Sequence, residues 1–527
     1  MRRLCLSTLV FLVLFPITLV TTGAPASAAA ASLTVATYDR TGAKVAAKLH
    51  LVNTETNNNY TATGNKAKAL PKGTYAVLAD IWTSHDQTQT IGGQIVTVSG
   101  TTRSTIDARR GRALRISLDK DPGAVFDREM SARICLRDSL TTLDGWGAPG
   151  KLFVIPNGSR LLRFAYSAAW VAPDAHESYV VAGRTGATVP TAMGHTFRTA
   201  SLATVKGAFK SGPTVAEYAD LTLTEQGSCA TSGHNISSVD FPGTTTVHAS
   251  AGTWELGGFL NAFKETGEST NLGYMLPHTF TAAAGRSYRQ SYFNSAWGPA
   301  WDLPVLRNGG IEFLSESMFS DPIMGAEGMD DVQRSRITLY DARHRVVKAR
   351  WRTNQGGRWS AAPFSARTKT KGWYTLQVNA RRQRQPGLRI PVAPLSPRTD
   401  AVFHLKIDPK GAPRFADVIL PRMVPAGLSP TNSAAPGTST VVSIRPDRHR
   451  VYEDYRMGPV KARTVTVYAS FDDGRTWRAT PVRKVGATWQ AVVRNAGANG
   501  YVSLRSRLTT TSGQWTESTV YRAYRLG

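Results

Sequence analysis

Hydrophobic and polar residues alternate in short runs along most of the chain. Leu33–Tyr38 alternates like a half-buried strand, and comparable runs recur at 161–166, 218–223 and 465–469. Glycine, proline and asparagine separate the runs, and a period of two is typical of a strand with one buried face. No segment keeps the helical period for more than about two turns. The pattern predicts an all-β fold, built as a multidomain series of β-sandwiches.

Turn signals and composition divide the chain into regions. Residues 29–112 carry strands at the spacing of a small β-sandwich, and residues 113–420 form a central β region of one or two sandwiches. Residues 421–440 are rich in Pro, Ser, Thr and Ala, which is typical of a linker or long loop. Residues 441–527 have the length of an immunoglobulin- or fibronectin-like sandwich. We therefore expect several β units in a row.

Residues 1–28 have the pattern of a secretory signal peptide. Arg2 and Arg3 precede an apolar run over Leu4–Val20, and Ala26-Ser27-Ala28 supplies small residues for cleavage. The run is short for a membrane anchor, and no later stretch approaches the ~18 consecutive apolar residues of a spanning helix. We expect a secreted, extracellular protein with no membrane span after signal cleavage.

Basic side chains outnumber acidic ones. The formal net charge is +26, and it is +24 once Arg2 and Arg3 leave with the signal. Such a charge favours anionic partners, so we expect an anionic wall polymer, a glycan or an extracellular protein. The densest basic runs, 109–112 and 381–384, lack the interleaved aromatic residues of a base-stacking platform, so no nucleic acid is expected.

Two cysteines, Cys135 and Cys229, remain after Cys5 leaves with the signal. A pair of cysteines in an exported chain suggests one disulfide, here closing a loop of about 95 residues. Metal binding by two lone thiols is the weaker alternative.

Catalytic motifs are missing from the chain. It contains no H-x-x-x-H pair, no H-E-x-x-H motif and no G-x-S-x-G elbow. The histidines are mostly single and lie within β patterns, among them His176, His195, His248, His278 and His404. We therefore expect no catalytic residue, no metal ligand and no cofactor. Triads are recognised by geometry rather than by order, so an extracellular hydrolase stays the alternative, either a serine peptidase relative or a glycan-acting enzyme.

An acidic stretch at 312–331 stands out from the basic chain. No Lys or Arg occurs from Ile311 through Gln333, and the acidic residues are Glu312, Glu316, Asp321, Glu327, Asp330 and Asp331. Oxygen ligands in a glycine-containing loop suit calcium, but the spacing does not fit an EF-hand. A solvated acidic loop is the expectation, with a calcium site as the alternative.

Tryptophans offer a second binding option. Four of them lie close together in the sequence: Trp297, Trp301, Trp351 and Trp359. Exposed on the face of a sandwich, such rings suit stacking on sugars, whereas a place in the core is the commoner role.

Two short motifs resemble known modules. Leu70–Tyr75, with the sequence L-P-K-G-T-Y, joins a tight turn to an aromatic plug and resembles prealbumin-like, carboxypeptidase-regulatory-type modules, which are usually non-catalytic. Ser470–Trp477 matches the S-x-D-x-G-x-T-W Asp-box of sialidase-like propellers, where it is a hairpin element. A propeller needs at least about four blades and this chain has one copy, so we expect a structural hairpin.

The same C-terminal motif carries a wider resemblance. Together with 500–505 and Tyr524–Leu526, it is similar to the C-terminal β region of large secreted actinobacterial subtilisin-like proteases. Leu70–Tyr75 and Ile106–Arg109 are similar to the accessory region of the same proteins. The Asp, His and Ser motifs of the peptidase module are missing. The resemblance therefore implies an accessory region without its catalytic module, acting in adhesion, as a scaffold or beside a protease.

Overall fold

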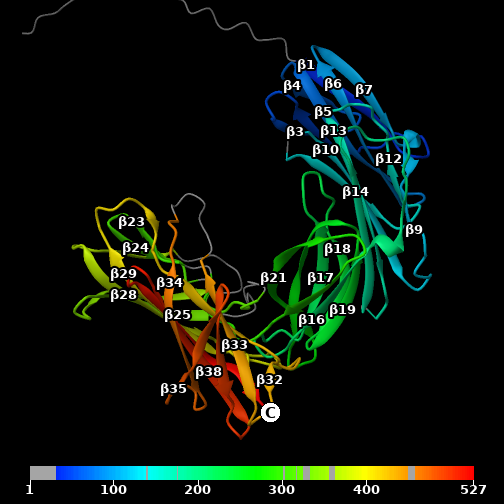
Figure 1. Ribbon diagram of the computed structural model, residues 1–527. Coiled ribbons are helices and arrows are strands. Elements are labelled where there is room, and N and C mark those ends of the chain that lie inside the picture. The colour runs from blue at the N-terminus through cyan, green and yellow to red at the C-terminus, as the bar shows by residue number, and fades with distance from the viewer. Residues whose placement is uncertain are drawn as a thin grey trace, which may run out of the picture.

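The computed structural model describes residues 31–137, 140–174, 176–300, 303–315, 317–323, 333–354, 362–448 and 457–527. The expected signal peptide at 1–28 lies outside these ranges. Within them, thirty-nine strands and two short 3-10 turns, η1 (Ala108–Arg110) and η2 (Thr199–Ser201), form eight sheets. The prediction of an all-β fold of several sandwiches is confirmed. The sheets follow one another along a curved arc from the N-terminal to the C-terminal part (Figure 1).

The N-terminal sandwich stacks two sheets over a core that includes Leu33, Leu51 and Tyr75. Tyr75 is fully buried and its hydroxyl donates to the Pro71 carbonyl at 2.8 Å, so the predicted turn and aromatic plug form one unit. Sheet 1 contains β4 (Ala67–Leu70), β1 (Ala31–Tyr38) and β7 (Thr101–Asp107). Sheet 2 contains β3 (Asn59–Thr63), β2 (Lys48–Asn53), β5 (Gly73–Thr83), β6 (Thr88–Val98), β12 (Leu152–Val154) and β8 (Arg112–Ala113). Because β12 pairs with β6, the first sandwich takes a strand from beyond the expected boundary at residue 112.

Sheet 3 is buried on both faces. Ile134 and Phe164 face the core shared with sheet 2, whereas Val180 and Val247 face the core shared with sheet 4. Sheet 3 contains β11 (Thr142–Gly147), β10 (Asp127–Leu136), β13 (Leu162–Val171), β14 (Glu177–Thr185), β19 (Gly243–Ala249), β16 (Ala203–Phe209) and β22 (Ser287–Tyr292). Sheet 4 contains β18 (His234–Asp240), β17 (Tyr218–Glu225), β20 (Gly252–Phe263) and β21 (Ser269–Ala282), and a separate ribbon pairs β15 (Gly194–Phe197) with β9 (Arg115–Leu118).

Sheet 6 joins the central and C-terminal regions. One face of it packs on sheet 5 through residues such as Phe403 and on sheet 7 through residues such as Leu504. Sheet 5 contains β27 (Phe364–Arg367), β24 (Gly310–Phe313), β23 (Val305–Arg307) and β30 (Arg414–Phe415). Sheet 6 contains β26 (Val346–Asn354), β25 (Gln333–Asp341), β28 (Gly372–Arg382), β29 (Arg398–Ile407), β39 (Trp515–Leu526), β38 (Gly500–Thr510), β34 (Ala462–Ser470), β35 (Arg478–Thr480) and β32 (Ser433–Ala434). Since β29 pairs with β39, main-chain hydrogen bonds cross the expected boundary at residue 441.

The expected linker or long loop at 421–440 lies partly in strands and partly in the loops between them. It begins inside β31 (Leu420–Pro425), which is buried throughout and pairs with β33 (Ser439–Asp447). These strands form sheet 7 with β37 (Thr488–Arg494) and β36 (Val482–Val485). Proline is tolerated on edge strands, and β31 is an edge strand, so the composition that suggested a linker also suits this position. Farther along, Asn432 is fully buried and its side-chain amide donates to the carbonyls of Ser211 and Phe293.

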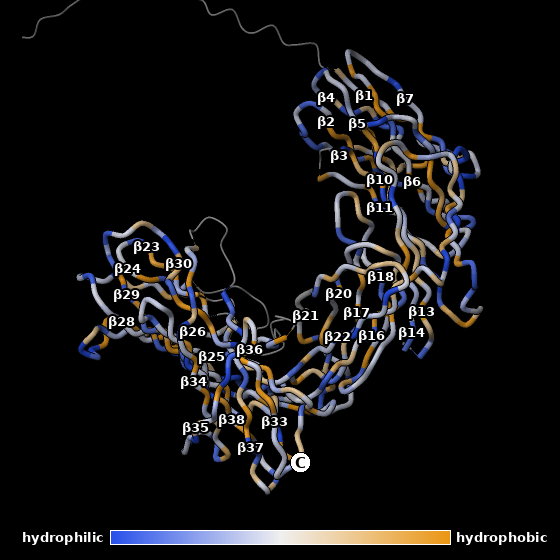
Figure 2. Tube along the Cα trace, viewed as in Figure 1, coloured by the Kyte–Doolittle hydropathy of each residue, from blue (hydrophilic) through white to orange (hydrophobic). Residues whose placement is uncertain are grey.

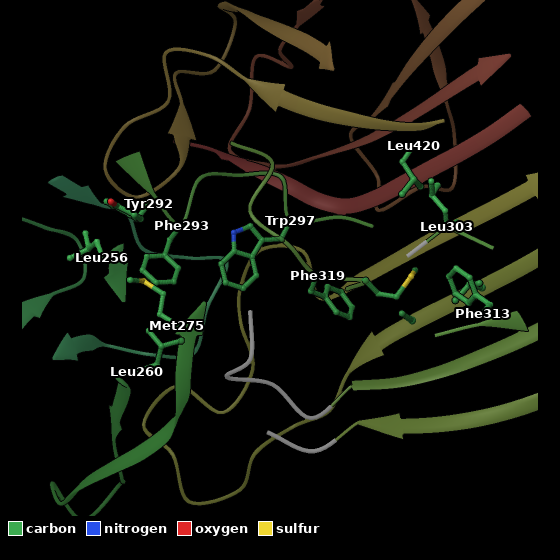
Figure 3. Close-up of a cluster of buried hydrophobic side chains, with 14 of the residues drawn as sticks. Leu256, Leu260, Met275, Tyr292, Phe293, Trp297, Leu303, Phe313, Phe319 and Leu420 are labelled. Carbon is green, nitrogen blue, oxygen red and sulfur yellow. The ribbon is translucent and has the colours of Figure 1, made fainter. Parts of the chain in front are cut away.

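One hydrophobic core continues from the sheet 3–sheet 4 sandwich into the sheet 5–sheet 6 sandwich (Figure 3). Trp297 lies between them, fully buried, with Phe293 on one side and Phe319 on the other. Figure 2 shows hydrophobic and hydrophilic positions interleaved along the strands, as expected for sheets with one buried face. The described residues contain no helix with the length and apolarity needed to cross a membrane.

Candidate functional site

The outer face of sheet 6 is the solvent side of β25, β26, β28, β29, β34, β38 and β39. Alternate residues of these strands, such as Ile337, Leu376 and Phe403, are buried on the opposite side. The outer positions carry aromatic rings, amides and more cationic side chains than carboxylates. Among the cations are Arg334, Arg336, Arg381, Arg398, Lys406, Arg505 and Arg507, and among the carboxylates are Asp400 and Glu517. The sheet therefore presents one continuous cationic and aromatic surface.

A stack of three rings crosses this outer face. His404 on β29 stacks on Trp373 of β28 at 4.7 Å and on Trp515 of β39 at 5.2 Å between ring centroids. The ammonium of Lys406 lies 4.7 Å from the centre of the Trp373 ring, and the guanidinium of Arg507 lies 4.1 Å from that of Trp515. Burial, His344 and Arg507 lower the pKa of His404, so the imidazole favours its neutral form in the stack.

The Asp-box motif, Ser470–Trp477, adds to the outer face of sheet 6 beside β34 and β35. Ser470 and Asp472 accept hydrogen bonds within the turn between β34 and β35, and the indole of Trp477 donates to the Gly474 carbonyl at 3.0 Å. Hydrogen bonds donated to its carboxylate by the Thr476 side chain, the Thr476 backbone and the Ser470 hydroxyl hold the pKa of Asp472 far below its usual value. The Arg505 guanidinium lies 4.1 Å from the centre of the Trp477 ring. The motif thus forms a turn that places one more ring beside a cation.

Three arginines form a row on adjacent strands of the outer face. Arg334 pairs directly with Arg381 across β25 and β28, and Arg381 pairs directly with Arg398 across β28 and β29. Arg336 lies two residues along β25, with its guanidinium over the half-exposed ring of Trp351. Like charges directly opposite each other in a sheet destabilise it. The three opposed arginines, Arg334, Arg381 and Arg398, together with the neighbouring Arg336, are called the arginine row below.

The carboxylates near this row are already engaged. Asp400 accepts from Arg398 at 2.7 Å, and also from Asn379 and Tyr521. Arg334, Arg336 and Arg381 have no carboxylate partner among the residues that the structure describes. Among the described residues, this part of the face therefore carries three arginines without a carboxylate partner beside an exposed aromatic ring, an arrangement suited to anionic groups.

Each of the two alternatives for the tryptophans holds at one described position. Trp351 is 52% exposed on the outer face, whereas Trp297 is a core residue with no exposure. Trp301 and Trp359 lie outside the described residues. Two further rings of the face, Trp373 and Trp515, were not singled out from the sequence. Each occupies a position that alternates with the buried residues of its strand, and this alternation could have predicted that the ring lies on the solvent side.

The structure also joins a serine, a histidine and a glutamate. Ser167 Oγ lies 2.6 Å from His234 Nε2, and His234 Nδ1 lies 3.2 Å from Glu129 Oε2. The hydrogen bond to His234 lowers the pKa of Glu129, so the carboxylate stays ionised. The order of contacts is that of an acyl-transfer triad, which no motif in the sequence announced.

Burial argues that this chain of side chains is structural. Ser167 and His234 are each 1% exposed, between sheet 3 and sheet 4, and Thr231 donates to Ser167 Oγ at 2.7 Å. A reacting carbonyl must come within about 3 Å of the nucleophile, and the burial of Ser167 beneath Thr231 leaves it almost no surface open to solvent. The contacts therefore satisfy the hydrogen-bonding needs of buried polar groups. Residues 225–236 lie over sheet 3 at this point, and we call this segment the cover.

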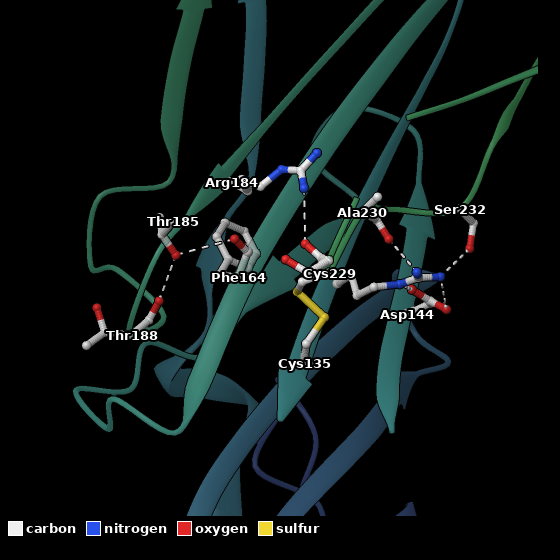
Figure 4. Close-up of a disulfide and its surroundings, with 11 residues drawn as sticks. Cys135, Asp144, Phe164, Arg184, Thr185, Thr188, Cys229, Ala230 and Ser232 are labelled. Carbon is white, nitrogen blue, oxygen red and sulfur yellow. Dashed lines mark hydrogen bonds and ion pairs between the residues drawn. A yellow bond between two sulfur atoms is a disulfide. The ribbon is translucent and has the colours of Figure 1, made fainter. Parts of the chain in front are cut away.

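A disulfide fastens the same cover to sheet 3. Cys135 on β10 is bonded to Cys229, with 5.8 Å between their Cα atoms, which confirms the predicted pairing (Figure 4). Arg133 donates to Asp144, to Ser232 and to the Ala230 carbonyl beside it, while Arg184 donates to the Ser228 carbonyl. These contacts hold the cover in place over Ser167.

We expect the intact protein not to react with a fluorophosphonate probe. The probe needs an exposed serine activated by a base, and Ser167 is covered. Labelling is measured by gel fluorescence and peptide mapping, with a serine hydrolase as positive control and Ser167→Ala as negative control. Modification at Ser167 in the oxidised, folded protein would establish the hydrolase alternative.

The acidic stretch differs from the expected solvated loop where the structure describes it. Glu312 is ion-paired with Arg307, and Asp321 is 1% exposed and accepts from the backbone N–H groups of Asn294 and Ile323. Both carboxylates are satisfied within the fold, so they are not free ligands. Glu316, Glu327, Asp330 and Asp331 lie outside the described residues. Within the described ranges no group of three or more metal-ligating side chains occurs.

The remaining histidines singled out in the sequence lie away from the outer face. His195 stacks on Tyr166 at 3.7 Å, and His248 stacks on Tyr179 at 4.5 Å. His176 is exposed, and burial lowers the pKa of His278 in β21. Of the five, His404 alone belongs to the ring stack.

Comparisons with known proteins leave the family open. No protein-family model matches the chain, and no curated protein matches it. Among solved structures, the Bacillus anthracis TIE protein matches at 11% identity and a TM-score of 0.12, over 50% of each chain. Trypsin-activated alpha-2-macroglobulin from Escherichia coli matches at 9% identity and a TM-score of 0.15, over 90% of this chain and 39% of its own.

A third solved structure is a Bacteroides ovatus protein, SGBP-B of a mixed-linkage glucan utilization locus, in complex with a heptasaccharide. It matches at 12% identity and a TM-score of 0.08, over 65% of this chain and 90% of its own. Such scores carry no functional argument, so function has to be argued from the residues.

Proposed function

We propose that this is a secreted, non-catalytic protein that binds an extended anionic polymer through the outer face of sheet 6. The arginine row carries the proposal. Arg334, Arg381 and Arg398 oppose one another across three strands, an arrangement that costs folding stability and is relieved when an anion binds. The ring stack and Trp351 add flat apolar surface beside the charges, which suits the sugar or backbone units of such a polymer.

The extracellular setting is part of the proposal. It is supported by the signal-peptide pattern at 1–28 and by the Cys135–Cys229 disulfide, which persists in oxidising compartments. From the resemblance to the accessory region of subtilisin-like proteases, we also propose that the protein works beside a separate peptidase and holds it near a wall polymer.

Charge removal at the arginine row is expected to abolish most polymer binding. The variant Arg334→Gln/Arg336→Gln/Arg381→Gln removes the three cations that lack a carboxylate partner, and each charged hydrogen bond contributes about 1.5–3 kcal/mol. We expect at least about a hundredfold weaker co-sedimentation with cell-wall peptidoglycan that carries its anionic polymer. Binding by the unaltered protein is expected to fall as salt rises.

The matched control is Arg110→Gln/Arg112→Gln/Arg115→Gln, which removes equal charge from exposed positions in the N-terminal part. It should bind as the unaltered protein does. The row variant should have a thermal midpoint at least as high as that of the unaltered protein, because like-charge repulsion is relieved. Two outcomes would contradict the proposal. Equal losses of binding in both variants would show a non-specific charge effect. Equal binding to chitin, to cellulose or to peptidoglycan without its anionic polymer would favour a neutral glycan as the ligand.

A further inference from the structure

The C-terminal sandwich is open along one edge. β35 ends sheet 6, β36 ends sheet 7, and the chain crosses from one sheet to the other at Pro481. A cavity of about 600 Å³ opens at this crossing, lined by residues of β34, β35, β36 and β37 and of the turns beside them. The volume falls in the range of small-molecule sites, which is about 300–1,000 Å³.

The wall of this cavity is apolar. It is formed by Ala469, Phe471, Pro481, Val482, Val492 and Val493. Ala469 and Val493 also belong to the core between sheets 6 and 7, and Phe471 and Val482 pack against that core. An apolar ligand lying here would extend the core of the sandwich rather than cover a surface patch. The cavity therefore favours a hydrocarbon or aromatic group.

The charged residues that line the cavity are all basic. Arg478, Arg483 and Arg494 contribute to the lining, and no Asp or Glu does. Arg483 donates to Gln490 at 3.2 Å, and the guanidinium of Arg478 lies 5.9 Å from the centre of the Phe471 ring. None of the three arginines is ion-paired with a described residue. The lining thus combines apolar side chains with arginines that have no ion-pair partner among the described residues.

We propose that this cavity binds a single-chain anionic amphiphile. The hydrocarbon chain lies against the apolar wall, and a carboxylate, sulfate or phosphate head group accepts hydrogen bonds from the arginines. A neutral sugar leaves the arginines without a counter-ion, and a polyanion leaves the apolar wall unfilled, so neither matches both features. The site is separate from the outer face of sheet 6 and goes beyond the polymer-binding function.

Binding is measured by isothermal titration calorimetry with decanoate, octanoate and decanol, each below its aggregation limit. Decanoate should bind about tenfold more tightly than octanoate, because two more methylenes are buried. Decanol, which has the same chain length and no charge, should bind at least about tenfold more weakly than decanoate. Bound decanoate should also raise the thermal midpoint, since it binds the folded state.

Arginine variants test whether decanoate lies in this cavity. Arg478→Gln/Arg494→Gln should weaken decanoate binding about a hundredfold and leave decanol unchanged. The control Arg475→Gln removes an exposed charge from the preceding turn, outside the cavity, and should bind decanoate normally. The arginine-row variant of sheet 6 should also bind decanoate normally, which distinguishes the two proposals.

Three results would overturn the inference. They are equal affinity for decanol and decanoate, unchanged decanoate binding in the Arg478/Arg494 variant, and binding seen only with phosphatidylglycerol vesicles. The last result would assign these arginines to a membrane surface instead of a monomeric ligand.

Discussion

Replacing Trp297 with alanine is expected to lower the free energy of unfolding by about 3–5 kcal/mol. The ring has no exposure, and it lies 5.9 Å from Phe293 between centroids. The guanidinium of Arg382, itself buried, lies 4.9 Å from the centre of the indole and would lose a cation–π partner. Because the core is continuous at this point, the loss should weaken the joint between the sheet 3–sheet 4 and sheet 5–sheet 6 sandwiches.

The measurement is urea unfolding together with calorimetry. A multidomain chain need not unfold in one step, so the calorimetric trace of Trp297→Ala should also separate into more than one transition. Trp351→Ala is the matched control: its ring is exposed, so its free energy of unfolding should stay within about 0.5 kcal/mol of that of the unaltered protein.

Trp297→Phe keeps most of the ring contacts at this joint. It also removes an indole N–H that has no hydrogen-bond partner among the described residues, so it should lose less than half as much stability as the alanine variant. Equal stability of the Trp297 and Trp351 alanine variants would contradict the role of Trp297.

Breaking the disulfide is expected to have an effect of similar size. Cys135 and Cys229 are 94 residues apart, and a loop of about this length corresponds to about 4–5 kcal/mol in the chain-entropy model. The contacts of Arg133 and Arg184 remain in the reduced protein, so it should fold at room temperature with a lower unfolding midpoint.

The measurement is denaturant unfolding of the unaltered protein with and without dithiothreitol. Cys135→Ser/Cys229→Ser should match the reduced protein and show no further change with the reductant. A reduction effect below about 1 kcal/mol would mean that the side-chain contacts alone hold the cover over sheet 3.

The alternation of apolar and polar residues was enough to predict the strands. In β28, for example, the buried residues Tyr374, Leu376, Val378 and Ala380 alternate with Thr375, Gln377 and Asn379. The disulfide was also predictable, since the pattern at 1–28 suggests export and the two cysteines that follow it leave one pairing. These properties depend on residue type and local spacing, which the sequence shows directly.

The linker and the triad-like contacts were not predictable in the same way. Pro421 and Pro425 suit a loop and an edge strand equally, and the partner of β31 is needed to choose between them. Ser167, His234 and Glu129 come from three strands of two sheets, and their contact depends on how those sheets stack. Their burial, which argues against catalysis, is likewise a tertiary property.

By itself the sequence determined the fold class, the disulfide and the excess of positive charge, because each follows from periodicity or composition. Only the tertiary structure decided where that charge gathers. Arg334, Arg381 and Arg398 belong to three different strands, β25, β28 and β29. The register of these strands places the three arginines side by side. Tertiary packing also separated the two tryptophans: Trp351 is exposed on the outer face of β26, whereas Trp297 lies between β22 and β23 and is buried where the two sandwiches meet.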